Sequence, residues 1–267
     1  MLYHYTSIDT LVQILSKKQI KFNTLINCDD LDEAESADLG NAGRYVFVSC
    51  WTREPEESIP MWSQYTGNMH GVRIGMREFP FVKKHFSVDQ CGAELDSYLD
   101  LEKYYNEDKM MFVADQPKLI DVDYVMNEDL LYPKIITEGT EEDIEKYIKG
   151  ESSKIGISLD PIGRYKRKAW DFQKECRYKI FGLPMGMKSI NVTPEIQFEK
   201  QRELVKRLKD ETYLPPYQSL FLELDDEAIR EMEIVFGPRM TESEELLVQT
   251  FLQGYGLSGR KSGLRIQ

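Results

Sequence analysis

Residues 168–181 read KAWDFQKECRYKIF, a basic and aromatic segment that runs into a short alternating stretch. From Glu175 onward every second residue is charged, a period of two that is typical of a half-buried β-strand. We expect Cys176, Tyr178 and Ile180 on the core face, and Glu175, Arg177 and Lys179 on the other. A carboxylate on a rigid strand beside two cations stays ionised near neutral pH and can orient a hydroxyl or stabilise positive charge. The alternative is a solvated strand face with an ordinary surface ion pair.

The composition predicts an ordinary globular core without a membrane span. The chain has 267 residues, of which 41% are apolar, enough for one large domain or two small ones. No run approaches the roughly 18 to 20 apolar residues that a membrane-spanning helix needs. Residues 1–5 lack the features of a signal peptide, so we expect a cytoplasmic protein. The net charge of −12 argues against a general nucleic-acid-binding surface but leaves room for a local basic groove.

The cysteines and histidines lack metal-ligand spacing, and we predict no metal site. These residues are Cys28, Cys50, Cys91 and Cys176 with His4, His70 and His85. Without a Cys-x-x-Cys pair they suggest neither a disulfide framework nor a zinc site. The acidic segment 25–35 lacks the central glycine and oxygen spacing of a calcium loop, which favours a solvated loop or helix start. The alternative is a metal-dependent nuclease that uses Asp29, Asp30, Asp32 and Glu33.

Short strands towards both ends of the chain, with helices between them, predict an α+β or mixed α/β fold. We expect strands at 2–6, 19–22, 45–51, 70–76, 219–224 and 231–236. We expect helices to start after Ser7, Thr140, Thr193 and Thr241, because each residue begins a capping pattern or precedes a first-turn proline. No interdomain linker is evident, so we predict a single domain, 1–267. The acidic, tyrosine-rich range of about 88–133 is interpreted as an insertion or lid.

Five short motifs resemble a large bacterial and phage family known only as a domain of unknown function, DUF2971. The motifs are YHYTS at 3–7, SCW at 49–51, MWxxY at 61–65, GVxI at 71–74 and KxWx4ExR at 168–177. The resemblance covers most of the chain outside its acidic middle. The family's usual Asn-Asp pair near the start is interrupted here, where residues 27–30 read NCDD.

The order of these motifs also resembles the ADP-ribosyltransferase superfamily in its His-Tyr-Glu clade. That clade includes diphtheria-type toxins, poly-ADP-ribose polymerases and toxins that modify DNA bases. The resemblance implies a split antiparallel or mixed β-sheet core with flanking helices, NAD as the substrate, and Glu175 as the catalytic residue. It implies NAD binding by His4, Thr6, Trp51, Tyr65 and Arg177, with Trp51 standing where many members carry Tyr.

The implied reaction breaks the N-glycosidic bond to a cationic nicotinamide and leaves an oxocarbenium-like ribose. The protein would supply orientation and charge stabilisation. Candidates for the pyrophosphate are Arg53, Arg73 and Lys168. The acceptor is not specified by the sequence; a protein, a nucleic acid or water would each serve, as in a toxin or a phage-conflict effector.

A second hypothesis is a binding module without turnover on the same scaffold. Its basic and aromatic groove would consist of Arg164, Tyr165, Lys166, Arg167, Lys168 and Trp170, which suit the phosphates and bases of a nucleotide or nucleic acid. Each single residue also has a structural interpretation. His4 suits a hydrogen-bonded core position, and Trp62 with Tyr65 suits one packing face of a helix.

Overall fold

Strand β13 (Glu175–Leu183) lies inside the main sheet of the computed structural model, which describes residues 1–88, 93–112, 116–151, 154–190 and 193–266. It pairs antiparallel with β3 (Val46–Thr52), from Glu175 opposite Thr52 to Phe181 opposite Val46. Its other edge pairs with β8 (Lys118–Asp121) and β7 (Met111–Phe112). With strands on both sides, β13 has its backbone hydrogen bonds satisfied away from water.

Strand β3 has β13 on one edge, and its other edge is shared by β1 (Leu2–Thr6) and β2 (Gln19–Thr24), between which the sheet opens. The pairing of β3 with β2 reaches Val48, whereas its pairing with β1 is at Thr52. Residues 49–51 therefore lie where β1 and β2 diverge from each other. The remaining strands extend the sheet beyond β2 and β1: β14 (Ser219–Glu223), β4 (Val72–Met76), β15 (Glu233–Phe236) and β16 (Gly259–Lys261).

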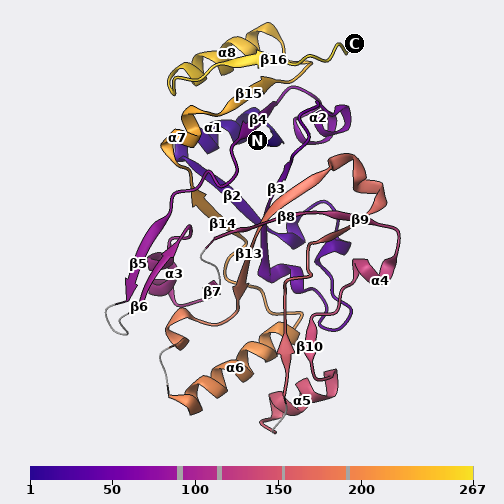
Figure 1. Cartoon of the computed structure of the whole chain (residues 1–267), viewed down its shortest axis with the longest axis vertical. Helices are drawn as coiled ribbons and strands as arrows, with labels where there is room; N and C mark the ends of the chain where they lie inside the picture. Colours follow the sequence, from indigo (N-terminus) through magenta and orange to yellow (C-terminus); the bar gives the residue numbers. More distant parts are fainter. Residues whose placement is uncertain (89–92, 113–115, 152–153, 191–192, 267) are drawn as a thin grey trace.

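Helices lie around this sheet, and small two-stranded ladders extend from it. The helices are α1 (Ile8–Lys17), α2 (Ile59–Tyr65), α3 (Leu101–Glu107), α4 (Glu128–Leu131), α5 (Glu141–Lys149), α6 (Pro194–Lys209), α7 (Asp226–Arg230) and α8 (Glu242–Gln253). The ladders pair β5 (Lys84–Val88) with β6 (Ala93–Ser97), β9 (Asp123–Val125) with β12 (Tyr165–Arg167), and β10 (Ile136–Glu138) with β11 (Gly156–Ile157). Figure 1 shows α8 and β16 at one end of the molecule and α5 with α6 at the other.

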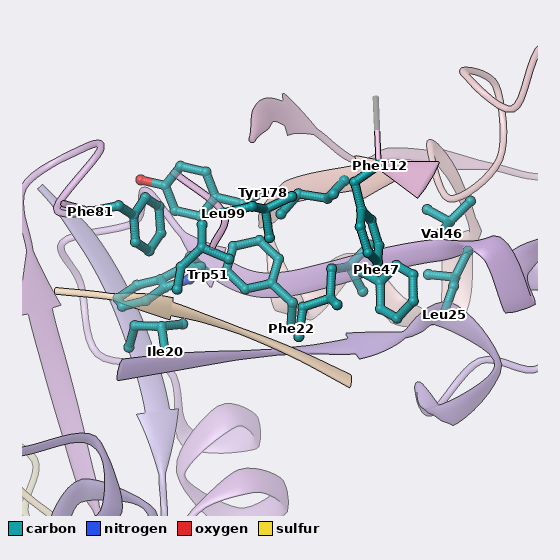
Figure 2. Close-up of a cluster of buried hydrophobic side chains, with 14 of the residues drawn as sticks. Ile20, Phe22, Leu25, Val46, Phe47, Trp51, Phe81, Leu99, Phe112 and Tyr178 are labelled. Carbon is teal, nitrogen blue, oxygen red and sulfur yellow. The ribbon is translucent and has the colours of Figure 1, made fainter. Parts of the chain in front are cut away.

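An aromatic core fills one face of the sheet around β2, β3 and β13 (Figure 2). The Tyr178 ring lies 5.1 Å from that of Phe81, and Phe47 lies 5.9 Å from Phe112. The Tyr178 hydroxyl is satisfied in this setting because it accepts a hydrogen bond from the Phe79 amide at 2.9 Å. Burying each such ring contributes roughly 1.5–3 kcal/mol, so this face holds β13 firmly in place.

The predicted helix starts are confirmed. The Ser7 hydroxyl accepts from the Thr10 amide at the start of α1. Thr140 and Thr241 each form a capping box with the acidic residue three positions later, and α6 follows Thr193. Gly150 ends α5 with a φ of 86°, a left-handed conformation that glycine adopts without steric cost. These signals are local, which is why the sequence alone revealed them.

The prediction that β13 is half-buried is wrong. Glu175, Arg177 and Lys179 are 6%, 0% and 1% exposed, so the charged face is as buried as the apolar one. The reason is charge compensation by residues from distant parts of the chain. The acidic segment is likewise less solvated than predicted, since Glu33 is 1% exposed and lies in a short 3-10 turn, Asp32–Ala34.

The range 88–133 contributes in part to the main sheet. Strand β8 pairs with β13 from Cys176 opposite Asp121 to Lys179 opposite Lys118. Residues 89–92 and 113–115 of this range lie outside the described residues. The mixed α+β class is confirmed, while the ADP-ribosyltransferase-like assignment stays a prediction. In the described part of the chain, every helix is too short or too polar to cross a bilayer.

We expect Gly71→Ala to destabilise the fold, because a Cβ at this position would lie 2.2 Å from the Thr6 carbonyl oxygen on β1. Overpacking against backbone costs about 1–3 kcal/mol. Urea denaturation should show this loss. The control is Gly254→Ala, whose nearest contact is 3.3 Å and whose φ is −61°, and it should leave the midpoint almost unchanged. Equal midpoints for both variants would contradict the close approach at Gly71.

Candidate functional site

Two cations and two carboxylates form a buried charge cluster, which consists of Glu33, Lys166, Glu175 and Arg177. Glu175 Oε1 accepts from Arg177 Nε at 2.6 Å, and Glu175 Oε2 accepts from Lys166 Nζ at 2.9 Å. Arg177 Nη1 donates to Glu33 Oε2 at 2.7 Å, and Lys166 Nζ lies 3.6 Å from Glu33 Oε1. All four residues are at most 6% exposed, and their formal charges cancel.

The cluster keeps Glu175 ionised. Burial works to raise the pKa of the Glu175 carboxyl, but the charges of Arg177 and Lys166 outweigh it and hold this pKa below its usual value. The balance is reversed at Glu33, where burial dominates over the attraction of Arg177 and Lys166 and raises the pKa. The pKa values of the two carboxyls are therefore shifted in opposite directions, and the cluster favours the anionic form at Glu175.

A hydrogen-bond chain connects this cluster to helix α2. Lys166 Nζ donates to Gln173 Oε1 at 2.9 Å, and Gln173 Nε2 donates to the Tyr65 hydroxyl at 2.5 Å. The Tyr65 hydroxyl in turn donates to Asp29 Oδ2 at 2.6 Å. The two bonds fix the orientation of the Tyr65 side chain, whose ring offers an aromatic face for contact with a ligand.

A cavity of about 590 Å³ lies at the opening between β1 and β2. Its volume is within the range of about 300–1,000 Å³ that small-molecule sites occupy. Five of the predicted site residues line it, namely His4, Thr6, Trp51, Tyr65 and Glu175. The cavity thus brings together residues from β1, β3, α2 and β13, which lie between positions 4 and 175 of the sequence.

His4 is fixed in one tautomer by the backbone of β3. Its Nδ1 lies 2.8 Å from the Cys50 carbonyl oxygen, and because a carbonyl only accepts, Nδ1 carries the proton. Burial lowers the pKa of His4 more than this hydrogen bond raises it. The ring is therefore neutral near pH 7, with Nε2 as a hydrogen-bond acceptor.

Trp51 and Arg177 are both almost fully buried, but only Trp51 lines the cavity. Trp51 is 3% exposed, its Nε1 donates to Ser49 Oγ at 2.9 Å, and its ring lies 5.1 Å from that of His4. Figure 2 shows it among the core side chains Ile20, Phe22 and Phe81. Arg177 is fully buried and lies outside the cavity lining. In this geometry Trp51 supports His4, and Arg177 supports Glu175.

Of the four cations predicted for the groove, Lys166 lines the cavity, whereas the cavity lining lacks Arg164, Arg167 and Lys168. Arg164 pairs with Asp123 at 2.9 Å, Arg167 pairs with Asp32 at 2.5 Å, and Lys168 pairs with Asp171 at 2.7 Å. Each cation already has a carboxylate, so an added phosphate would compete with an existing ion pair. The neighbouring Lys166 is buried in the charge cluster.

The two arginines considered for the pyrophosphate are also engaged elsewhere. Arg53 pairs with Glu78 and, at 3.1 Å, with Asp121. Arg73 is 2% exposed, lies 4.4 Å from the centre of the Tyr3 ring and donates to the Pro55 carbonyl at 2.8 Å. The cavity lining contains neither of them.

The carboxylates proposed for a nuclease take separate partners. Asp29 accepts from Tyr65, Asp32 from Arg167, and Glu33 from Arg177. Among the described residues, His, Cys, Asp and Glu side chains form no group of three or more that would hold a metal ion.

Sequence reasoning missed Gln173 as a link in the site and assigned Glu33 and Lys166 to other roles. Gln173 is uncharged and is followed by Lys174 in the left-handed conformation, with a φ of 43°, so no sequence period reveals its direction. Glu33 lies 144 residues before its partner Arg177. Its position beside Asp32 in an acidic run is typical of a solvated carboxylate. Only the three-dimensional pairing shows that Glu33 is buried instead.

We expect Arg177→Met to destabilise the protein by about 3–5 kcal/mol, because it leaves two buried carboxylates with Lys166 alone. Adding Glu33→Gln to this variant should restore part of the loss, which a double-mutant cycle in urea would measure. Arg167→Met is the matched control, since its ion pair is half-exposed, and it should change stability little. Equal effects of Arg177→Met and Arg167→Met would contradict the importance of the cluster.

The lowered pKa of the buried Lys179 should make the free energy of unfolding depend on pH. Lys179 donates to the Asp160 and Ile162 carbonyls, and burial lowers its pKa from 10.5 to about 8. Between these two pKa values the unfolded chain binds more protons, so this residue makes the unfolding free energy rise with pH. Subtracting the curve of Lys179→Met from that of the wild type should give a difference that grows between pH 8 and 10. A difference independent of pH would mean that Lys179 titrates normally.

Comparisons with known proteins add one match. A family model described as a protein of unknown function (DUF2971) matches residues 61–178. The curated proteins and the solved structures gave no match. The matched segment begins in α2, includes Tyr65, Lys166 and Gln173, and ends in β13 after Glu175 and Arg177. The matched segment contains Lys166, Glu175 and Arg177 of the charge cluster. Over this segment the chain is therefore similar to proteins whose function is unknown.

Proposed function

We propose that this protein uses NAD as a substrate, either to transfer ADP-ribose to an acceptor or to hydrolyse the bond to nicotinamide. The observation that carries the proposal is the convergence of His4, Tyr65 and Glu175 on one cavity of about 590 Å³. The resemblance to the His-Tyr-Glu clade assigned His4 and Tyr65 to NAD binding and Glu175 to catalysis. The proposal requires these three side chains to line one cavity, and their spacing in the sequence does not by itself bring them together.

The proposed reaction cleaves the bond between the ribose C1′ and the nicotinamide nitrogen. Both electrons of that bond leave with nicotinamide, which becomes neutral, and positive charge develops on the ribose. The acceptor then attacks C1′ and loses a proton. For a glycohydrolase the acceptor is water, and for a transferase it is a nucleophile of a protein or nucleic acid.

In this scheme the ionised Glu175 accepts a hydrogen bond from a ribose hydroxyl. Arg177 and Lys166 hold both carboxylate oxygens, and a carboxylate has about four lone-pair sites, so acceptor capacity remains. The two cations hold the carboxylate in place, so it orients the ribose, and its negative charge offsets the positive charge that develops as the bond breaks. The neutral His4 offers Nε2 to a second hydroxyl, and the ring of Tyr65 stacks against the cationic nicotinamide, a contact worth about 0.5–2 kcal/mol.

One observation favours an alternative, a module that binds nucleotides without turnover. Both oxygens of Glu175 already have cationic partners, which is also what a purely structural ion cluster would show. Calorimetric binding of NAD without release of nicotinamide would select this alternative.

We expect Glu175→Gln to lower the rate of nicotinamide release by about 10²-fold or more, a loss of roughly 3 kcal/mol, with NAD affinity kept within a few-fold. The variant leaves Lys166 and Arg177 with Glu33 as their only carboxylate in the cluster, and the resulting net positive charge beside the developing positive charge raises the barrier further. His4→Ala and Tyr65→Ala should instead weaken NAD binding.

The measurement pairs calorimetry with a nicotinamide-release assay on the same preparations, after melting temperatures have been compared. Glu231→Gln is the control, an exposed carboxylate that pairs with Arg77 outside the cavity, and it should behave as the wild type. Labelled NAD incubated with a cell extract would identify the acceptor. The proposal fails if the wild type neither binds NAD nor releases nicotinamide.

A further inference from the structure

The outer part of the same cavity, away from Glu175, has the composition of a nucleotide subsite. Its walls are formed by one side of α1, by strand β2 and by strand β14. Residues from these elements that line the cavity are Thr10, Gln13, Lys17, Gln19, Lys21, Asn23 and Phe221. None of them belongs to the motifs that the sequence analysis singled out.

Phe221 is an exposed aromatic residue on this wall. Its side chain is 44% exposed, although the alternating neighbours Leu220 and Leu222 on β14 are fully buried. Phe221 lies directly opposite Lys21 in the antiparallel pairing of β14 and β2. Directly opposite residues project from the same face of a sheet with their Cβ atoms about 4.5–5.5 Å apart. An aromatic and a basic side chain therefore project from neighbouring positions of the cavity wall.

Lys17 and Lys21 are exposed cations without an anionic partner. Within the described ranges, neither has a carboxylate at ion-pairing distance, whereas the nearby Lys18 pairs with Asp226 at 2.6 Å and Lys84 pairs with Glu223 at 2.8 Å. The contrast is notable in a chain with a net charge of −12, in which carboxylates outnumber cations. Two uncompensated cations at one cavity favour an anionic ligand.

We propose that Lys17, Lys21 and Phe221 bind a nucleoside diphosphate, with the base on the Phe221 ring and the two phosphates on the lysines. Bases stack on aromatic rings irrespective of their identity, while ammonium groups bind phosphates as point charges. Gln19 and Asn23 lie two positions before and after Lys21 on β2, so they project from the same face, and their side chains supply hydrogen-bond donors and acceptors to the ribose or the base edge.

This inference rests on the proposed function for its identification of the ligand as the ADP half of NAD. In that arrangement the ADP half occupies the α1, β2 and β14 side of the cavity, and the nicotinamide ribose reaches His4 and Glu175. Binding of a nucleoside diphosphate does not itself need turnover, so the two proposals are tested separately.

The test measures binding of ADP, adenosine and inorganic pyrophosphate by calorimetry to the full-length protein. We expect Lys17→Ala with Lys21→Ala to weaken ADP and pyrophosphate by about tenfold or more while sparing adenosine, and to make ADP binding less sensitive to salt. Phe221→Leu should weaken ADP and adenosine by about tenfold and leave pyrophosphate unchanged, because it removes the stacking face only. Phe221→Tyr should restore the affinity.

The control is Lys18→Ala with Lys84→Ala, which removes the same charge from lysines that already have carboxylate partners. It should leave all three affinities unchanged. Failure of the wild type to bind ADP at millimolar concentration, or equal affinities in the Lys17/Lys21 variant and its control, overturns this subsite. Binding of ADP with the expected variant effects but without nicotinamide release supports the subsite and rejects only the NAD reaction.

Discussion

The structure depends on the compensation of Arg177 inside the sheet. A guanidinium that is fully buried is tolerated only where carboxylates and carbonyls replace its hydration, and here Glu175, Glu33 and the Gly163 carbonyl do so. This compensation lets β13 carry charges through the interior between β3 and β8. It also holds the Glu175 carboxylate in one position and one protonation state, which are the two properties that a ribose-orienting group needs.

The position of the cavity follows from how β3 divides its second edge between two strands. β2 pairs with its beginning and β1 with its end, so the sheet opens beside residues 49–51. His4 spans part of this opening through its hydrogen bond to the Cys50 carbonyl. A backbone group that would otherwise have paired with a strand thus fixes the tautomer of a cavity-lining side chain.

Local signals in the sequence predicted much of the fold. Ser7, Thr140 and Thr241 cap helices through bonds to residues three positions away, and such chemistry is legible without tertiary structure. Alternation in residues 175–181 predicted the strand but not the burial of its charged face. A period of two is the same for a solvated face and for a compensated one, and the compensating Glu33 is 144 residues away.

The site was predictable to a similar degree. The resemblance singled out His4, Tyr65 and Glu175, which line one cavity, because each lies in a short motif with a recognisable order. Gln173 and the pairing of Lys166 with Glu175 depend on how the turn at 168–173 folds back over β13, and no motif records that. The sequence analysis did not single out Lys17, Lys21 and Phe221, because lysines at helix ends and aromatic residues on strands occur in most proteins. They point to a ligand only because they line the same cavity.

The long separation within the charge cluster has a kinetic consequence. Glu33 and Arg177 close a loop of 144 residues, so they pair only after segments far apart in the sequence have met. Closing such a loop costs conformational entropy before the contact between its ends can form. Contacts of long sequence separation therefore form late and slow folding. Before that pairing forms, the charged face of β13 lacks its Glu33 counter-charge, so we expect the sheet interior to be completed only after distant parts of the chain have met.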